Sequence, residues 1–108
     1  MGATKSQLFT AEQNRIAVLA KALAHPARVA ILQYLIKTKD CVCGQIVDVL
    51  PLAQSTISQH LKELKNVGII EGEIEGVKTC YCINPAVWQE LKLIFGHLFD
   101  QYDPSCCK

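Results

Sequence analysis

The sequence predicts one mainly helical domain with a single β-hairpin, and three observations support this fold class. Apolar residues recur with helical spacing along most of the chain, whereas the segment 69–84 alternates with the period of a strand. Proline and glycine interrupt the helical pattern at several points, so the predicted helices are short. The length of 108 residues fits one compact domain and hardly two.

The first two helices are separated by a proline. Thr10 and Gln13 form a capping-box pattern, which predicts a helix that begins there and is closed by His25. Pro26 disfavours helical backbone at the residue before it but suits the first turn of a helix. We therefore expect the second helix over 26–37.

The next two helices are predicted to form a helix-turn-helix. A third helix is expected over 41–50, weakened near its start by Gly44, and a fourth over 55–67. Gly68 follows as the residue that ends the fourth helix. A tight turn joins the two, and the second has a polar exposed side.

A hairpin over 69–84 and a final helix over 86–102 complete a winged helix-turn-helix, with four helices, two strands and a last helix in chain order. The domain is expected over 10–102, between a flexible arm and a mobile tail at 103–108. The last helix is apolar on two sides and needs a partner beyond its own domain. We therefore expect a homodimer through the first and last helices.

The fourth helix is the candidate for reading DNA. The formal net charge is only +1, so a nucleic-acid interface must depend on local patterning. The segment 54–62 contains no acidic residue, and Gln, Ser and Thr can contact base edges while Lys contacts phosphate. The alternative is an ordinary solvated helix face. The candidate DNA-binding residues are Gln54, Ser55, Thr56, Ser58, Gln59, His60, Lys62 and Lys65, with Lys78 of the hairpin.

Six cysteines are the other chemical feature of the chain, at positions 41, 43, 80, 82, 106 and 107. The first residues lack the apolar segment of a signal peptide, which favours a cytoplasmic protein with reduced thiols. No run approaches the roughly 20 apolar residues of a membrane span. Clustered reduced cysteines are typical of metal ligands or redox sensors.

The spacing of Cys41 and Cys43 indicates how they could act. Side chains at i and i+2 diverge in a helix but share a direction in extended backbone. Both thiols can therefore bind one ion only if the start of the predicted third helix is not helical. Because Gly44 makes that conformation accessible, the segment is interpreted as a chelating hinge that leads into the recognition helix.

The chain resembles the ArsR/SmtB metal-responsive repressors. The segments that carry the resemblance follow the family order: LAHPARVAILQYL at 23–35, CVCGQI at 41–46, STISQHLKEL at 55–64 and GIIEGEIEGVKTCYCINP at 68–85. The resemblance implies a cytoplasmic homodimeric repressor, not an enzyme, that binds an inverted-repeat operator without metal and is released by a toxic ion.

By resemblance, Cys41 and Cys43 match the thiolate site of the sensors for trivalent arsenic or antimony, As(III) or Sb(III), and that of the sensors for cadmium or lead. The arsenite branch typically has a further cysteine where this chain has Ile46, so the third thiolate is assigned to Cys106 or Cys107 of the tail. Cys80 and Cys82 share a strand face and could also chelate, but we expect them to be structural. The zinc-type site of the last helix is absent.

Three alternatives remain open. Cys41 or Cys43 could form a disulfide or polysulfide link with a tail cysteine, which would make a redox- or sulfide-responsive repressor. A fourth thiolate would favour a cadmium- or lead-responsive repressor. A small metal-buffering protein without a DNA role belongs to another class. No nucleophile–base pair or phosphate-binding loop indicates an enzyme.

Overall fold

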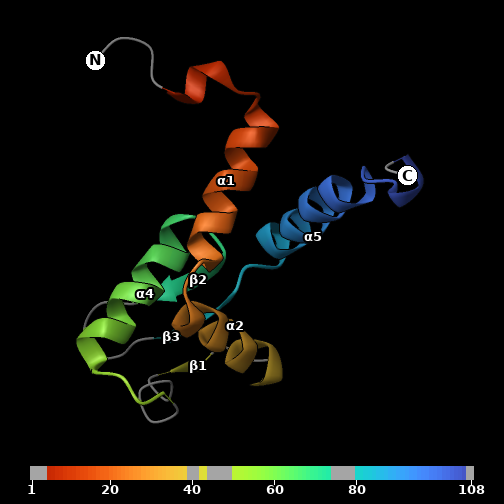
Figure 1. Ribbon diagram of the computed structural model, residues 1–108. Helices are drawn as coiled ribbons and strands as arrows, with labels where there is room; N and C mark the ends of the chain where they lie inside the picture. Colours follow the sequence, from red (N-terminus) through yellow and green to blue (C-terminus); the bar gives the residue numbers. More distant parts are fainter. Residues whose placement is uncertain (1–4, 39–41, 44–49, 74–79, 107–108) are drawn as a thin grey trace.

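The computed structural model describes residues 5–38, 42–43, 50–73 and 80–106 of the chain. Figure 1 shows α1, α2, α4 and α5 arranged around a small sheet. The elements in chain order are η1 (Lys5–Leu8), α1 (Ala11–Leu23), α2 (Pro26–Thr38), β1 (Val42–Cys43), α4 (Gln54–Asn66), β2 (Ile70–Glu73), β3 (Cys80–Ile83), α5 (Pro85–Asp100) and η2 (Pro104–Cys106).

The boundary between α1 and α2 confirms the sequence signals. The Thr10 side chain accepts a hydrogen bond from the backbone N–H of Gln13, and the Gln13 side chain accepts one from the Thr10 N–H, which completes the capping box. Pro26 begins α2 as predicted. His25 caps the start of α2 instead of closing α1, because its Nδ1 accepts a hydrogen bond of 3.0 Å from the Ala27 N–H.

Helix α4 ends as its sequence predicts. Gly68 has a φ of 88°, and its N–H donates to the Lys65 carbonyl, while the Ile69 N–H donates to the Leu64 carbonyl. These two bonds form a Schellman motif, which turns the chain directly from α4 into β2. At the other end, Ala53 provides no side-chain cap, so α4 begins without the hydrogen bond that a serine would supply.

The prediction of a helix over 41–50 is wrong where the structure describes it. Val42 and Cys43 form strand β1, which pairs antiparallel with β3, while residues 44–49 lie outside the described residues. The predicted two-stranded hairpin is thus part of a three-stranded sheet in the order β1-β3-β2. Cross-strand pairing with β3 supplies hydrogen bonds that a two-residue helical start would lack, and β-branched Val42 suits extended backbone.

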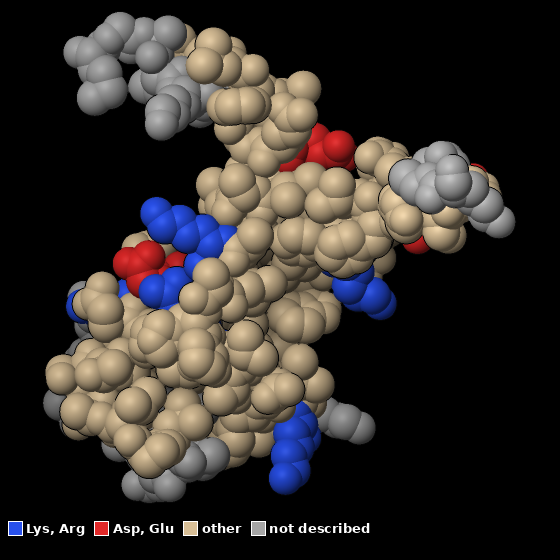
Figure 2. All heavy atoms as spheres, viewed as in Figure 1, with Lys and Arg blue, Asp and Glu red and all other residues tan. Residues whose placement is uncertain are grey.

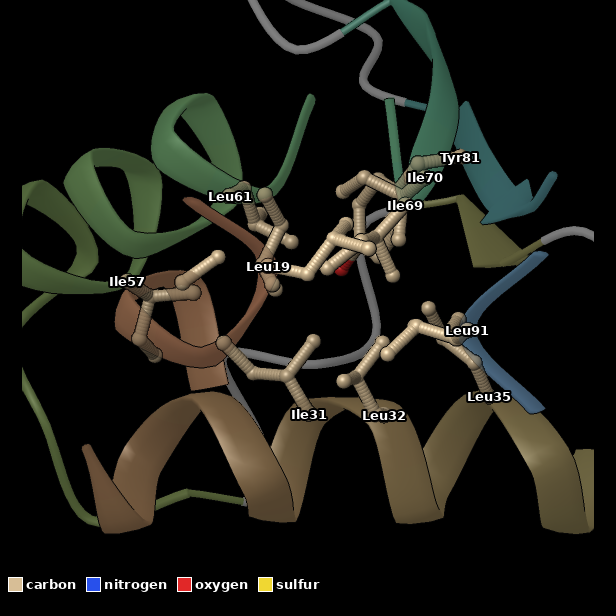
Figure 3. Packing of buried hydrophobic residues seen from close by; sticks show 12 residues of the cluster. Leu19, Ile31, Leu32, Leu35, Ile57, Leu61, Ile69, Ile70, Tyr81 and Leu91 are labelled. Carbon is tan, nitrogen blue, oxygen red and sulfur yellow. The ribbon is translucent and has the colours of Figure 1, made fainter. Parts of the chain in front are cut away.

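The core lies where α1, α2, α4, the sheet and α5 meet. Figure 3 shows its apolar side chains converging from these elements, with Leu19, Ile31 and Ile69 each 0% exposed. Tyr81 of β3 belongs to the same cluster and is 1% exposed. The sheet therefore turns one face toward the helices, and the position of Tyr81 identifies that face.

The outer parts of α1 and α5 extend away from this core (Figure 1). The radius of gyration is 16.5 Å, whereas a compact chain of this length has about 13 Å. Residues 5–8 of the predicted N-terminal arm form η1, and residues 1–4 lie outside the described part. No single described helix is long and apolar enough to cross a membrane; α1 and α2 reach that length and composition only as a pair bent by 89°.

Candidate nucleic-acid interface and thiol site

Helix α4 has one buried face and one polar face. Its buried residues are Ile57, His60, Leu61 and Leu64, which recur at helical spacing, and the three apolar ones belong to the core. Most of the predicted DNA-binding residues are exposed on the remaining surface: Gln54, Ser55, Thr56, Gln59, Lys62 and Lys65, with Ser58 partly buried. This surface is free of carboxylates up to Glu63, so it can approach a phosphate backbone without local repulsion.

His60 does not lie on this polar face, contrary to the prediction. Its side chain is 8% exposed, and its Nδ1 accepts a hydrogen bond of 3.1 Å from Nε of Arg28. Its ring contacts the ring of His25, with 4.3 Å between centroids. The Nη1 atom of Arg28 also donates to the Ala22 carbonyl. His60 therefore joins α4 to the ends of α1 and α2 and leaves the DNA-facing set.

The environment of His60 favours its neutral form. Burial lowers the pKa of His60, and the neighbouring His25 and Arg28 lower this pKa further. A neutral ring keeps Nδ1 available as the acceptor for Arg28. The sequence alone did not predict Arg28 and His25 as partners of His60. Their contacts with His60 become evident only in the fold, which brings them close to α4.

The charges on the visible surface are dispersed. Figure 2 shows Lys and Arg side chains in separate groups, with Asp and Glu beside some of them. An ion pair joins α1 to α5, since Arg15 Nε and Glu90 Oε2 are 2.8 Å apart. The Arg15 hydrogen bond lowers the pKa of Glu90 below its usual range. The described residues on this face form no broad basic field around α4, so affinity for DNA must depend on its local contacts.

The predicted thiol site is described only in part. Cys43 lies in β1 and Cys106 in η2, whereas Cys41, Cys107 and the DNA-binding candidate Lys78 lie outside the described residues. The structure gives Cys43 the extended backbone that chelation by residues at i and i+2 requires. Among the side chains that are described, no group of three His, Cys, Asp or Glu lies close enough to hold a metal ion.

The cysteines of β3 lie beside β1, the strand that contains Cys43. Cys80 is the Cα partner of Cys43, and it is disulfide-bonded. Cys82 is a reduced thiol of intermediate burial. The alternation of the strand indicated that Cys80 and Cys82 share a face, but the pairing of β3 with β1 could not be predicted from it.

A model of the arsR family of bacterial regulatory proteins matches residues 25–71. The chain is 43% identical over 63 residues to the transcriptional repressor SmtB of Mycobacterium tuberculosis, which is 58% of the chain but only 46% of that protein. The chain therefore spans less than half the length of this curated relative.

Two further relatives are matched over most of their length. The transcriptional repressor PagR of Bacillus anthracis is 38% identical over 72% of the chain and 79% of its own length. The arsenical resistance operon repressor of Bacillus subtilis is 33% identical over 78% of the chain and 76% of its length. The solved structure of HlyU from Vibrio cholerae has a TM-score of 0.65 at 27% identity, and the match covers 87% of the chain and 98% of HlyU.

Proposed function

The chain belongs to the arsR family of bacterial regulatory proteins, and on that basis we propose that it is a homodimeric transcriptional repressor released from operator DNA by trivalent arsenic or antimony. Relatives in this family include an arsenical resistance operon repressor. The polar surface of α4, which carries no carboxylate before Glu63 and lies opposite the buried face, is the observation that carries the DNA-binding part of the proposal.

The residues that would contact DNA divide by chemistry. Gln54 and Gln59 can bond bidentately to adenine, and Lys62 and Lys65 can contact phosphate. Both lysines lie in the later part of α4, so the helix would enter the major groove with its first turns. The serine and threonine hydroxyls between them can serve either partner.

Exposed apolar side chains on the outer elements support the dimer. Phe9 is 55% exposed, Leu93 64%, Phe99 68% and Tyr102 65%. Leu93 and Phe99 lie in α5, whereas Phe9 follows η1 and Tyr102 follows α5. A second copy of the chain that buried these side chains would remove them from water, and its two-fold symmetry would require an inverted-repeat operator with half-sites about 34–36 Å apart or a multiple of this spacing.

Thiol chemistry supports a soft inducer. Cys41 and Cys43 are the proposed first ligands, and soft thiolates select soft ions such as trivalent arsenic. Arsenite prefers three sulfur ligands, so a further cysteine is needed, for which Cys106 and Cys107 of the tail are the sequence-based candidates. Ion binding at β1 would act on the segment that leads into α4 and thereby on DNA affinity.

The proposal is tested by arsenite titration of the reduced protein bound to its upstream promoter DNA, followed by fluorescence anisotropy. We expect arsenite to weaken DNA binding about 5- to 150-fold, the range of typical allosteric coupling. Cys41→Ser and Cys43→Ser should bind DNA like the wild type and lose this response. Wild-type protein that stays bound through excess arsenite would contradict the arsenic assignment, and the titration would then be repeated with cadmium and lead.

An oxidant-responsive repressor is the second candidate, favoured by the disulfide at Cys80. In that case, hydrogen peroxide would oxidise two thiols to one disulfide and be reduced to two waters. The same anisotropy assay separates the two signals, because peroxide would release DNA without arsenite and a reductant would restore binding.

A further inference from the structure

The sheet brings three cysteines to one face. Tyr81 is 1% exposed and faces the core, so its neighbours Cys80 and Cys82 belong to the opposite face of β3. Cys43 of β1 is the Cα partner of Cys80 and therefore occupies the same face as Cys80. These three positions come from two strands that are far apart in sequence but adjacent in the sheet.

The spacing of these positions suits a small three-coordinate ion. Directly opposed residues in an antiparallel pair have Cβ atoms about 4.5–5.5 Å apart, and diagonal neighbours are about 7–8 Å apart. Cys80 and Cys82 stand at i and i+2 on one strand. The disulfide at Cys80 independently indicates that another sulfur lies within covalent reach of this residue.

The tail is less well placed within one subunit. Cys106 lies in η2, which follows α5. Figure 1 shows α5 leading away from the sheet, so that the C-terminal end of α5 lies far from β1. A tail cysteine would have to come from another subunit or move across the molecule, whereas β3 is hydrogen-bonded to β1.

We propose that Cys43, Cys80 and Cys82 form a three-thiolate site for trivalent arsenic on the sheet face opposite the core, an inference that rests on the proposed function and replaces Cys41 and the tail cysteines with two cysteines of β3, the second strand of the wing formed by β2 and β3. In the binding reaction, arsenous acid exchanges its three hydroxyl groups for three cysteine sulfurs. Each thiol loses its proton, and three waters leave. The cysteines must be reduced first, so Cys80 binds only after its disulfide has been opened by a thiol reductant.

This site would join the segment before the recognition helix to the wing. Strand β3 pairs with β1 on one side and with β2 on the other, and β2 follows α4 through the Gly68 turn. An ion held between β1 and β3 therefore restrains both segments that flank α4. The site thus provides a direct mechanical connection between ion binding and the orientation of the DNA-reading helix.

The first test uses wild-type protein, fully reduced and loaded with sodium arsenite. Iodoacetamide then alkylates the accessible thiols, and peptide mass spectrometry identifies which cysteines are protected compared with arsenite-free protein. We expect protection of Cys43, Cys80 and Cys82 and full alkylation of Cys106 and Cys107. Protection of the tail pair with alkylation of Cys80 and Cys82 would overturn the inference.

The second test compares matched double variants. Cys80→Ser/Cys82→Ser should weaken arsenite binding at least about 10-fold, because the loss of a residue that only hydrogen-bonds to a metal ligand already lowers metal affinity by about that factor. Cys106→Ser/Cys107→Ser should bind arsenite like the wild type. Binding is followed by the ultraviolet absorbance of arsenic–thiolate bonds, and operator binding without arsenite verifies that each variant is folded.

The outcomes separate this inference from the proposed function. If the wild type binds no arsenite, the proposed function fails. If the wild type responds to arsenite and the wing double variant responds equally, only the wing-strand site fails. If Cys80→Ser/Cys82→Ser does not bind operator DNA, the inference is tested by the pattern of cysteines that arsenite protects from alkylation in the wild type.

Discussion

At the scale of single residues, His60 shows how a polar residue of the recognition helix can belong to the core. It accepts a hydrogen bond from Arg28 and contacts the His25 ring, so one buried side chain fixes α4 against the ends of α1 and α2. Because Nδ1 must remain unprotonated to accept that bond, the contact depends on pH.

We predict that this histidine makes the protein less stable in mild acid. The pKa of His60 is lowered in the folded chain, chiefly by burial, whereas the unfolded chain takes up the proton near the ordinary value of 6.5. Below that pH the unfolded state binds more protons, so the free energy of unfolding falls as pH decreases, by at most about 1.4 kcal/mol per pH unit for one proton. Above it this contribution is constant.

Urea unfolding at pH 7.5 and pH 5.5, at one protein concentration and under reducing conditions, measures the effect. His60→Gln retains an acceptor for Arg28 but does not titrate, so its stability should change less between the two pH values. His97→Gln is the matched control, because it removes an exposed histidine and should keep the wild-type loss. Equal losses in His60→Gln and the wild type would show that His60 does not cause them.

At the scale of elements, the wing depends on the close approach of β2 and β3. Gly72 has a φ of 129° and pairs with Tyr81. A Cβ atom at this position would clash with the Cys80 carbonyl oxygen and approach the Tyr81 Cα to 2.8 Å. The backbone of β3 cannot move away easily, because its other edge is paired with β1.

Gly72→Ala should therefore destabilise the protein by about 2–4 kcal/mol, from backbone strain and overpacking together. Thermal or urea unfolding measures the change. Gly96→Ala is the control in α5, since a Cβ there meets nothing within 4 Å, and alanine should stabilise the helix by up to about 1 kcal/mol. Similar values for the two variants would mean that the Gly72 contact does not constrain the wing.

The elements also show which features sequence reasoning can reach. The start of α1, the break at Pro26 and the end of α4 at Gly68 were predicted correctly, because each is determined by residues within one turn. Strand β1 was missed because it forms by pairing with β3, a partner far along the chain. The burial of His60 was missed for the same reason, since its contacts to Arg28 and His25 come from another helix and its flanking residue.

The candidate site likewise has features that depend on local sequence and features that depend on distant partners. The exposed residues of α4 were predicted from one amphipathic pattern, and their exposure follows from it. The roles of Cys80 and Cys82 could not be judged without the sheet order, because a strand pattern gives the face of a residue but not its neighbour. The sequence therefore predicts a chemical role for the thiols, and the fold is required to group them.

At the scale of the whole molecule, the single chain leaves its outer apolar surface uncovered. Arg15 and Glu90 hold α1 against α5, yet Leu93 and Phe99 remain 64% and 68% exposed. The ion pair is itself partly exposed, so its contribution to stability is small. The positions of α1 and α5 would then depend mainly on apolar contacts with a second copy.

We predict that Leu93→Glu/Phe99→Glu converts the protein to a monomer. Two buried carboxylates without partners would oppose association. In addition, each apolar side chain that is replaced loses about 1.5–3 kcal/mol of free energy from its burial in the interface. Sedimentation velocity measures the change in mass. Operator affinity should fall in parallel, because a monomer contacts one half-site only.

Ile36→Glu on α2 is the matched control, since Ile36 is also exposed, at 48%, but lies outside α1 and α5. It should leave both mass and operator affinity unchanged. Circular dichroism must show the helix content of the wild type in each variant, so that loss of dimer is not confused with unfolding. If Leu93→Glu/Phe99→Glu still sediments as a dimer, the exposed face of α5 is not the interface, and α1 with η1 would have to provide it through Phe9 and Val18, which are 55% and 44% exposed.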